Sequence, residues 1–201
     1  RHERSQASFN KVEGNNLMNK SNTPMKAFMK EFMLKRKIED IIVNVPDFPN
    51  KDIQFKDITP LFLNQQLLDE LITHYADKII VDSLVNKIVC IDSRGFIFGS
   101  LLAQKAGLPF VLARKSGKLP GEVLKLEYQL EYGSNSLEIQ KQDIDKEDNI
   151  MIVDDLLATG GTISAVAQLI EQLGGNVFCI WNLIELDFLE GRKNIKKIIK
   201  N

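Results

Sequence analysis

The segment Ile150–Thr162 limits the fold more than any other part of the chain. It consists of a short apolar run, two adjacent aspartates, and a loop of small residues that leads into a helical pattern. A continuous apolar run is typical of a strand that is buried on both faces. Two glycines before a helical pattern predict a tight turn into a helix. The segment therefore predicts a strand–turn–helix unit of an α/β sheet, with both acids at the end of the strand.

The same alternation of apolar strands and helical patterns runs through most of the chain. Strands are expected at Lys87–Asp92, Phe110–Ala113, Asn149–Val153 and Val177–Leu186, and helices at about 64–82, 97–107 and 163–174. Residues 114–136 are charged and contain several glycines, which indicates a mobile loop or an extended hairpin. The pattern predicts an α/β fold with a mainly parallel central sheet flanked by helices.

Composition excludes several classes of protein and favours none of the charged-surface functions. The chain has 201 residues and a net charge of −1, and no run approaches the length of a membrane span. We therefore expect no nucleic-acid partner and no membrane partner. Cys90 and Cys179 both lie in apolar stretches, which predicts buried, reduced thiols and a cytoplasmic location. Trp181 lies in an apolar strand and is expected in the core.

The N-terminal region differs from the rest in charge. Residues 1–37 carry nine basic and three acidic side chains. We expect residues 1–24 to be a disordered tail or an expression remnant, and residues 25–201 to form a single domain. Pro24 predicts a helix start, and five large apolar side chains then share one helical face: Met25, Phe28, Met29, Phe32 and Met33. The favoured interpretation is that this face packs on its own domain; a membrane-surface or partner helix is the alternative.

The loop after the two aspartates has the chemistry of a phosphate site. Free amides at a helix start bind anions, and glycine lets the backbone approach a phosphate closely. The side chains of Asp154 and Asp155 can hold the diol of a phosphorylated sugar. Neither the Walker pattern nor the dinucleotide pattern occurs in the chain.

This segment resembles the PRPP-binding motif of the type I phosphoribosyltransferases, in which two acids precede a Thr-Gly-Gly-Thr loop. PRPP is 5-phosphoribosyl 1-pyrophosphate. Over about residues 45–192 the chain resembles the adenine branch of that family. Five blocks carry the resemblance: Phe48-Pro49 with Phe55–Pro60, Asp92–Phe96, Arg114–Pro120, Leu130–Gly133 and Asp154–Thr162. The resemblance implies the family's fold with a small N-terminal hood, to which residues 25–60 contribute.

The resemblance also implies roles for individual residues. Glu131, Arg94 and Lys118 would be catalytic, and Gln54, Phe55 and Lys56 would bind the base. Binding of PRPP and AMP would fall to Asp154, Asp155, Ala158, Thr159, Gly160, Gly161, Thr162, Arg114, Lys115 and Tyr132.

The reaction that the resemblance implies is transfer of the phosphoribosyl group from PRPP to N9 of adenine, giving AMP and pyrophosphate. Magnesium would arrive with PRPP, without a dedicated protein site, and the enzyme would be a homodimer. The positive charge that develops on the ribose resembles that of glycosyl transfer. Such a reaction needs leaving-group stabilisation, an aligned nucleophile and exclusion of water.

Two departures from the family pattern and two rival functions stand beside this interpretation. Lys56 occupies a position where the family usually has arginine, and the chain ends soon after Arg192, which would shorten the family's terminal strand. One rival is a PRPP-sensing regulator without catalysis. The other is an aspartate phosphatase of the haloacid-dehalogenase type, which needs an Asp-x-Asp spacing that the adjacent Asp154 and Asp155 do not have.

Overall fold

The computed structural model describes residues 23–82, 84–129 and 134–196, which divide into two compact units. The first unit extends to Tyr75 and the second begins at Ala76, so the boundary falls inside one long helix, α3 (Gln65–Asp82). Nearly all of the predicted N-terminal tail lies outside the described residues. No described helix is long and apolar enough to cross a membrane.

The first unit contains two helices, a small hairpin and the start of α3. Its elements are α1 (Thr23–Ile41), β1 (Val43–Pro46), β2 (Gln54–Asp57) and α2 (Thr59–Leu63). The two strands are antiparallel, with Val43 opposite Asp57. In the connecting loop the Asp52 N–H donates to the Asp47 carboxylate at 2.8 Å. The hairpin lies within residues 25–60, from which the N-terminal hood is expected, and the hood itself stays a prediction.

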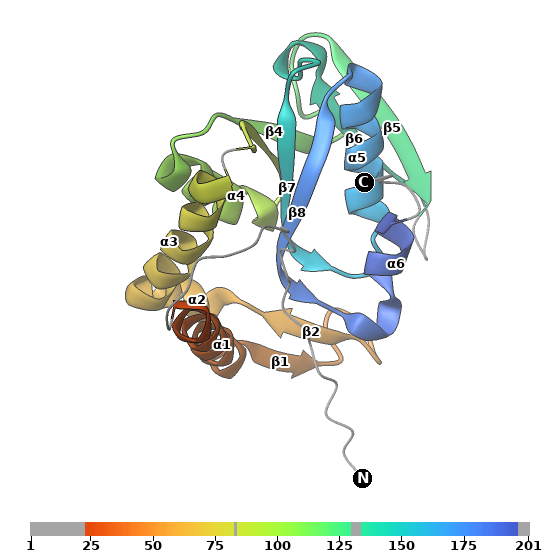
Figure 1. Ribbon diagram of the computed structural model, residues 1–201. Helices are drawn as coiled ribbons and strands as arrows, with labels where there is room; N and C mark the ends of the chain where they lie inside the picture. Colours follow the sequence, from red (N-terminus) through yellow and green to blue (C-terminus); the bar gives the residue numbers. More distant parts are fainter. Residues whose placement is uncertain (1–22, 83, 130–133, 197–201) are drawn as a thin grey trace. The chain divides into compact units, whose positions relative to one another are not determined.

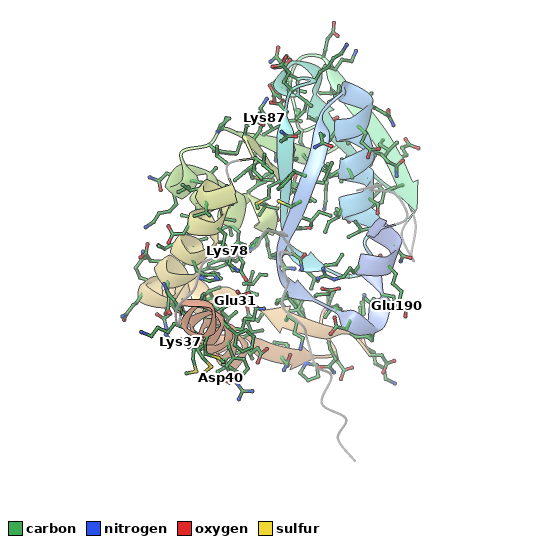
Figure 2. All side chains as sticks on the ribbon, viewed as in Figure 1. Glu31, Lys37, Asp40, Lys78, Lys87 and Glu190 are labelled. Atoms are coloured by element: carbon green, nitrogen blue, oxygen red, sulfur yellow. The ribbon has the colours of Figure 1, made fainter. Side chains whose placement is uncertain are left out.

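Helix α1 packs with the face opposite to the predicted one. Leu34 and Ile38 are buried, whereas the five apolar side chains of the predicted face, from Met25 to Met33, are 46–66% exposed. Both sides of the helix carry apolar residues, so periodicity alone cannot tell which side meets the protein. The favoured interpretation of the apolar face was therefore wrong. In Figure 2 the polar residues Glu31 and Lys37 mark this helix; Lys37 pairs with Glu70 of α3 at 2.8 Å.

The second unit is built on a six-stranded sheet, shown in Figure 1, with the order β5-β6-β4-β3-β7-β8. The strands β4 (Phe110–Lys115), β3 (Lys87–Ile91), β7 (Asn149–Leu157) and β8 (Asn176–Glu185) run parallel to one another, and β4 pairs antiparallel with β6 on its other side. Strands β5 (Val123–Gln129) and β6 (Ser134–Gln140) form an antiparallel pair at one edge. The predicted, mainly parallel α/β sheet is confirmed, and residues 114–136 contribute to an extended hairpin.

Helices cover this sheet, and short turns close the C-terminal part. The helices are α4 (Arg94–Ala106), α5 (Gly161–Leu173) and α6 (Gly191–Lys196), and 3₁₀ turns occur at Lys141–Asp143 and Asp187–Leu189. A glycine in the left-handed conformation ends both α4 and α5, as the sequence predicts.

The core consists of the apolar strand residues together with the inner faces of α4 and α5. Trp181 is buried against Phe98 with ring centroids 5.5 Å apart, which confirms its predicted place in the core. Cys90 is free and buried, and burial raises the pKa of its thiol to about 12. Cys179 is only half-buried, so the prediction of burial was wrong for this residue, which lies on the edge strand β8.

Candidate active site

The two aspartates lie inside β7 and not, as expected, beyond its end. The strand continues to Leu157, so both acids belong to the strand itself, and their carboxyl groups lie close enough to interact with each other. Asp154 is half-buried, and Asp155 is 5% exposed. The Asp155 N–H donates to the Asp154 carboxylate at 2.9 Å. The sequence placed the pair correctly at the carboxyl end of the sheet but made the strand too short, because Leu156 and Leu157 resemble the start of the loop.

The loop after β7 has the geometry of an anion site. Ala158–Gly160 form the turn, and Gly160 adopts the left-handed conformation (φ 85°) immediately before α5. Two observations favour glycine at this position. The left-handed conformation favours glycine, and a Cβ there would lie 2.8 Å from the Gly191 carbonyl oxygen. The first-turn amides of α5, from Gly161 onward, are therefore available to an anion, together with the hydroxyls of Thr159 and Thr162.

Two residues that sequence reasoning missed support this loop. The Asn194 side chain of α6 donates to the Thr159 carbonyl at 3.0 Å. The Tyr128 hydroxyl of β5 lies 3.3 Å from the Thr162 hydroxyl of α5. Both contacts join residues more than thirty positions apart. No local pattern in the chain signals either contact.

The loop between β3 and α4 brings a cation to the acid pair. The Arg94 guanidinium lies 2.8 Å from the Asp155 carboxylate. The next residue, Gly95, sits so close to β7 that a Cβ would lie 2.7 Å from the Val153 carbonyl oxygen. Arg94 therefore begins a helix that rests directly on the strand of the acids, and the structure brings together residues that the sequence placed in separate motifs.

The pKa values of both aspartates are raised above the usual range. For Asp154 burial is the main cause, and the charge of Asp155 adds to it. Burial also raises the pKa of Asp155, although Arg94 opposes the shift. Two neighbouring carboxylates beside one cation favour protonation of a carboxyl group. They also favour a ligand that donates hydrogen bonds to the carboxylate oxygens.

The predicted cationic loop follows β4. Arg114 is half-buried: its Nε lies 3.4 Å from the Asp92 carboxylate, and its Nη1 donates to the Lys118 carbonyl at 3.2 Å. Its guanidinium also lies 5.8 Å from the centre of the Phe96 ring. Lys115 and Lys118 are exposed, as residues that meet a charged ligand from solvent would be.

The three expected base-binding residues lie on β2 of the first unit. Phe55 contacts the Phe48 ring edge-on at 5.1 Å, and the Lys56 ammonium donates to the Asn44 side chain at 2.5 Å. Because neighbours in a strand point to opposite faces, Gln54 and Lys56 share one face and Phe55 has the other. A base stacked on Phe55 would therefore lie on the face opposite the Lys56 side chain. Glu131 and Tyr132 lie outside the described residues.

The acid pair offers oxygen ligands that suit magnesium. Magnesium in proteins usually keeps several waters and binds through one or two carboxylates together with substrate phosphates. The described residues include no group of three or more His, Cys, Asp or Glu side chains able to hold a metal. The carboxylates of Asp154 and Asp155 therefore fit an ion that a phosphorylated substrate also binds.

Comparison with known proteins identifies the family to which this site belongs. The family model of the phosphoribosyl transferase domain matches residues 61–200. The chain belongs to the phosphoribosyl transferase family. It is 46% identical to the adenine phosphoribosyltransferase of Carboxydothermus hydrogenoformans over 164 residues, which cover 81% of this chain and 96% of the relative. It is 48% identical to that of Thermoanaerobacter sp. over 163 residues, 81% of this chain and 94% of the relative.

Solved structures of this family share the fold. The adenine phosphoribosyltransferase of Saccharomyces cerevisiae, complexed with an imino-altritol bisphosphate and adenine, has a TM-score of 0.75 and 41% identity over 81% of this chain and 94% of its own. The enzyme of Trypanosoma brucei, in complex with AMP, pyrophosphate and ribose-5-phosphate, has a TM-score of 0.75 and 28% identity over 81% of this chain and 72% of its own.

Proposed function

We infer that the chain transfers the 5-phosphoribosyl group of PRPP to adenine, giving AMP and pyrophosphate. The observation that carries this function is the Asp154–Thr162 segment, with its acid pair, its left-handed glycine and its open helix start, in a chain nearly half identical to adenine phosphoribosyltransferases. Family membership argues against the phosphatase alternative.

The phosphate loop holds the 5-phosphate of PRPP. The amides of Gly161 and Thr162 and the hydroxyl of Thr159 supply donors, and the helix start adds favourable electrostatics. Asp154 and Asp155 accept the ribose hydroxyls. Burial raises the pKa values of both acids, so a diol that donates hydrogen bonds to both would relieve an unfavourable arrangement of the two carboxylates.

The cations hold the departing pyrophosphate. Arg94 stands beside Asp155 at the end of the sheet, and its guanidinium can share its donors between that carboxylate and the phosphate oxygens. Three further cations, at and after the carboxyl end of β4, also hold the pyrophosphate: Arg114, Lys115 and Lys118. Neutralising charge as the C1–O bond breaks stabilises the transition state more than the bound substrate.

Magnesium, when bound with PRPP, supplies further charge neutralisation on the pyrophosphate. Asp154 and Asp155 are the described side chains suited to approach it, directly or through water. We also assign Glu131 as the residue that accepts a proton or stabilises charge near the purine, and Tyr132 as a cover over the ribose. A homodimer and a cytoplasmic location complete the proposal.

The decisive experiment is an assay with labelled adenine, PRPP and magnesium. We expect AMP from adenine and none from hypoxanthine or guanine at the same concentration. Turnover of hypoxanthine at the adenine rate would contradict the specificity. A complete lack of turnover with retained PRPP binding would instead support the PRPP-sensing regulator. Glu131→Gln should lower kcat by roughly 100-fold while PRPP affinity stays the same.

Three variants test the base-binding strand. Phe55→Ala should raise the adenine KM, because the stacking face is lost, whereas Lys56→Ala should change it less, because the ammonium faces Asn44. Lys56→Arg tests whether the family's usual residue binds adenine more firmly. If all three variants have the same adenine KM as the unchanged chain, this strand has no part in binding the base.

A further inference from the structure

Strand β6 carries a buried carboxylate that the reaction described above does not use. Glu138 is 3% exposed and stands between Leu137 and Ile139, which are buried as well. It lies opposite Arg114 in the β4–β6 pairing. An acidic residue that is almost completely buried is uncommon and needs several hydrogen bonds to compensate for the loss of water.

Those hydrogen bonds come from the cationic loop. The backbone N–H groups of Lys118 and Leu119 both donate to one carboxylate oxygen of Glu138 at 2.9 Å. The Ser116 hydroxyl lies 3.5 Å from the other oxygen. Burial alone would raise the pKa of Glu138, but the backbone donors of Gly117, Leu119 and Lys118 lower it below its usual value. The residue is therefore held as an anion at the centre of the turn.

The backbone N–H and the backbone carbonyl of Lys118 are hydrogen-bonded to two different residues. Its N–H donates to Glu138 and its carbonyl accepts from the Arg114 guanidinium at 3.2 Å. With both groups fixed, the direction in which the exposed Lys118 side chain leaves the backbone is fixed as well. A cation that must meet a phosphate gains from such preorganisation, because less freedom is lost on binding.

We propose that Glu138 is a positioning residue for pyrophosphate binding: it shapes the Ser116–Leu119 turn so that Lys118 faces the pyrophosphate of PRPP. This proposal rests on the role assigned to Lys118 under the proposed function. It predicts that loss of Glu138 weakens PRPP and pyrophosphate binding and leaves adenine binding unchanged.

The test is a double-mutant cycle between Glu138→Ala and Lys118→Ala in the full chain, with steady-state kinetics for both substrates. We expect Glu138→Ala to raise the PRPP KM about ten-fold, the size expected for losing charged hydrogen bonds. The adenine KM should stay within about two-fold. Glu138→Gln keeps one carbonyl oxygen for the two N–H donors and should recover part of the loss. In the Lys118→Ala background, the same Glu138 change should have almost no further effect.

Glu127→Ala is the matched control. Glu127 lies on the neighbouring strand β5 and is exposed, paired only loosely with Lys125 at 3.5 Å. It should leave both KM values unchanged. If Glu138→Ala does not fold, Glu138→Gln takes its place in the cycle.

The outcomes separate the two proposals. If the effects of the Glu138 and Lys118 changes add, or if the PRPP KM does not rise, Glu138 is only a structural residue and the inference is overturned while the role of Lys118 stands. If Lys118→Ala alone leaves the PRPP KM unchanged, the assigned role of Lys118 is wrong, and the Glu138 inference fails with it.

Discussion

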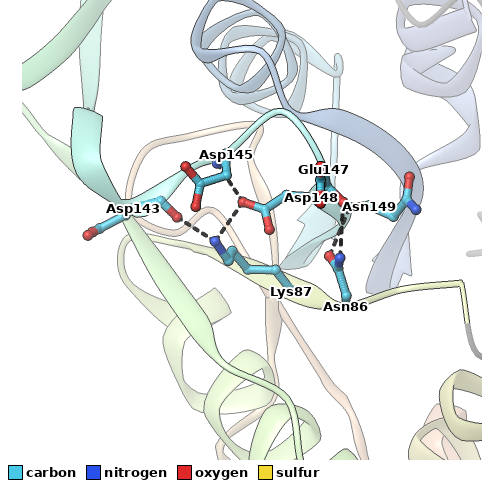
Figure 3. A network of polar contacts seen from close by, with 7 residues as sticks. All are labelled: Asn86, Lys87, Asp143, Asp145, Glu147, Asp148 and Asn149. Atoms are coloured by element: carbon cyan, nitrogen blue, oxygen red, sulfur yellow. Dashed lines mark hydrogen bonds and ion pairs between the residues drawn. The ribbon is translucent and has the colours of Figure 1, made fainter.

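The two ends of the parallel sheet differ in how well their buried carboxylates are paired with donors and cations. At the amino end, Lys87 donates to the Asp148 carboxylate at 2.6 Å and to the Asp143 carbonyl at 2.8 Å, and the Asp145 N–H donates to the same carboxylate at 2.6 Å (Figure 3). At the carboxyl end, Asp154 and Asp155 stand together beside Arg94, and the pKa values of both acids are raised.

The amino end continues this pattern with neutral groups. Asn86 donates to the Glu147 carbonyl at 3.1 Å and accepts from the Asn149 N–H at 2.8 Å. The protein thus matches donors to acceptors at one end of the sheet and crowds acids at the other. The paired charges at the first end stabilise the fold, whereas the second end keeps an unfavourable arrangement that the proposed substrate would relieve.

The largest effect is expected for Asp154→Asn. The ribose loses a charged acceptor, so PRPP affinity should fall by about 10- to 100-fold, whereas the melting temperature should not fall. Isothermal titration with PRPP and a thermal melt provide the two measurements. Asp148→Asn is the same chemical change at the other end of the sheet and should leave PRPP affinity within about two-fold. If the PRPP affinity of Asp154→Asn is unaltered, the proposed difference between the two ends of the sheet is wrong.

In stability the order of the two variants should be reversed: Asp148→Asn should lower the melting temperature, whereas Asp154→Asn should not. Asp148 is 8% exposed, and the change leaves the Lys87 ammonium without its charged partner. We expect a loss of about 2 kcal/mol, between the values typical of surface pairs and of fully buried pairs. That corresponds to a melting temperature about 4–8 °C lower. A melting curve that matches the unchanged chain would show that the network contributes nothing to stability.

The pH dependence of stability sharpens the comparison further. Because the pKa of Asp154 is higher in the folded than in the unfolded chain, the folded state binds the extra proton. The stability from this proton is complete below the ordinary aspartate pKa and is lost as the pH rises through the folded pKa. The melting temperature of Asp154→Asn minus that of the unchanged chain should therefore grow from acid to neutral pH. A difference that shrinks toward neutral pH would mean that the pKa is lowered.

The smallest effect concerns single neutral hydrogen bonds at the two ends. Asn194→Ala removes the donor to the Thr159 carbonyl and should raise the PRPP KM about three-fold. Asn176→Ala removes a similar bond, to the Asn149 side chain at 2.8 Å at the amino end, and should leave that KM unchanged. Steady-state kinetics distinguish the two variants, and equal KM values would deny α6 a role in supporting the phosphate loop.

Local sequence patterns were sufficient to predict most strands and helices of the second unit and the turn into α5. Ile150–Thr162 is one continuous segment, so its apolar run, its acids and its glycines predict a strand, an anion site and a helix without knowledge of any other part of the chain. The same local signals correctly placed the glycine ends of α4 and α5.

Tertiary structure alone decided which of these pieces meet. Arg94 reaches Asp155, Glu138 holds the turn before Pro120, and Asn194 supports Thr159 through contacts between residues far apart in the chain. The outward face of α1 was decided in the same way. Periodicity determines that a helix or strand has an apolar face, but the partner of that face depends on packing across the whole fold. For this reason the strand, the turn and the helix of residues 150–173 could be predicted from the sequence, whereas the residues that pack around them could not.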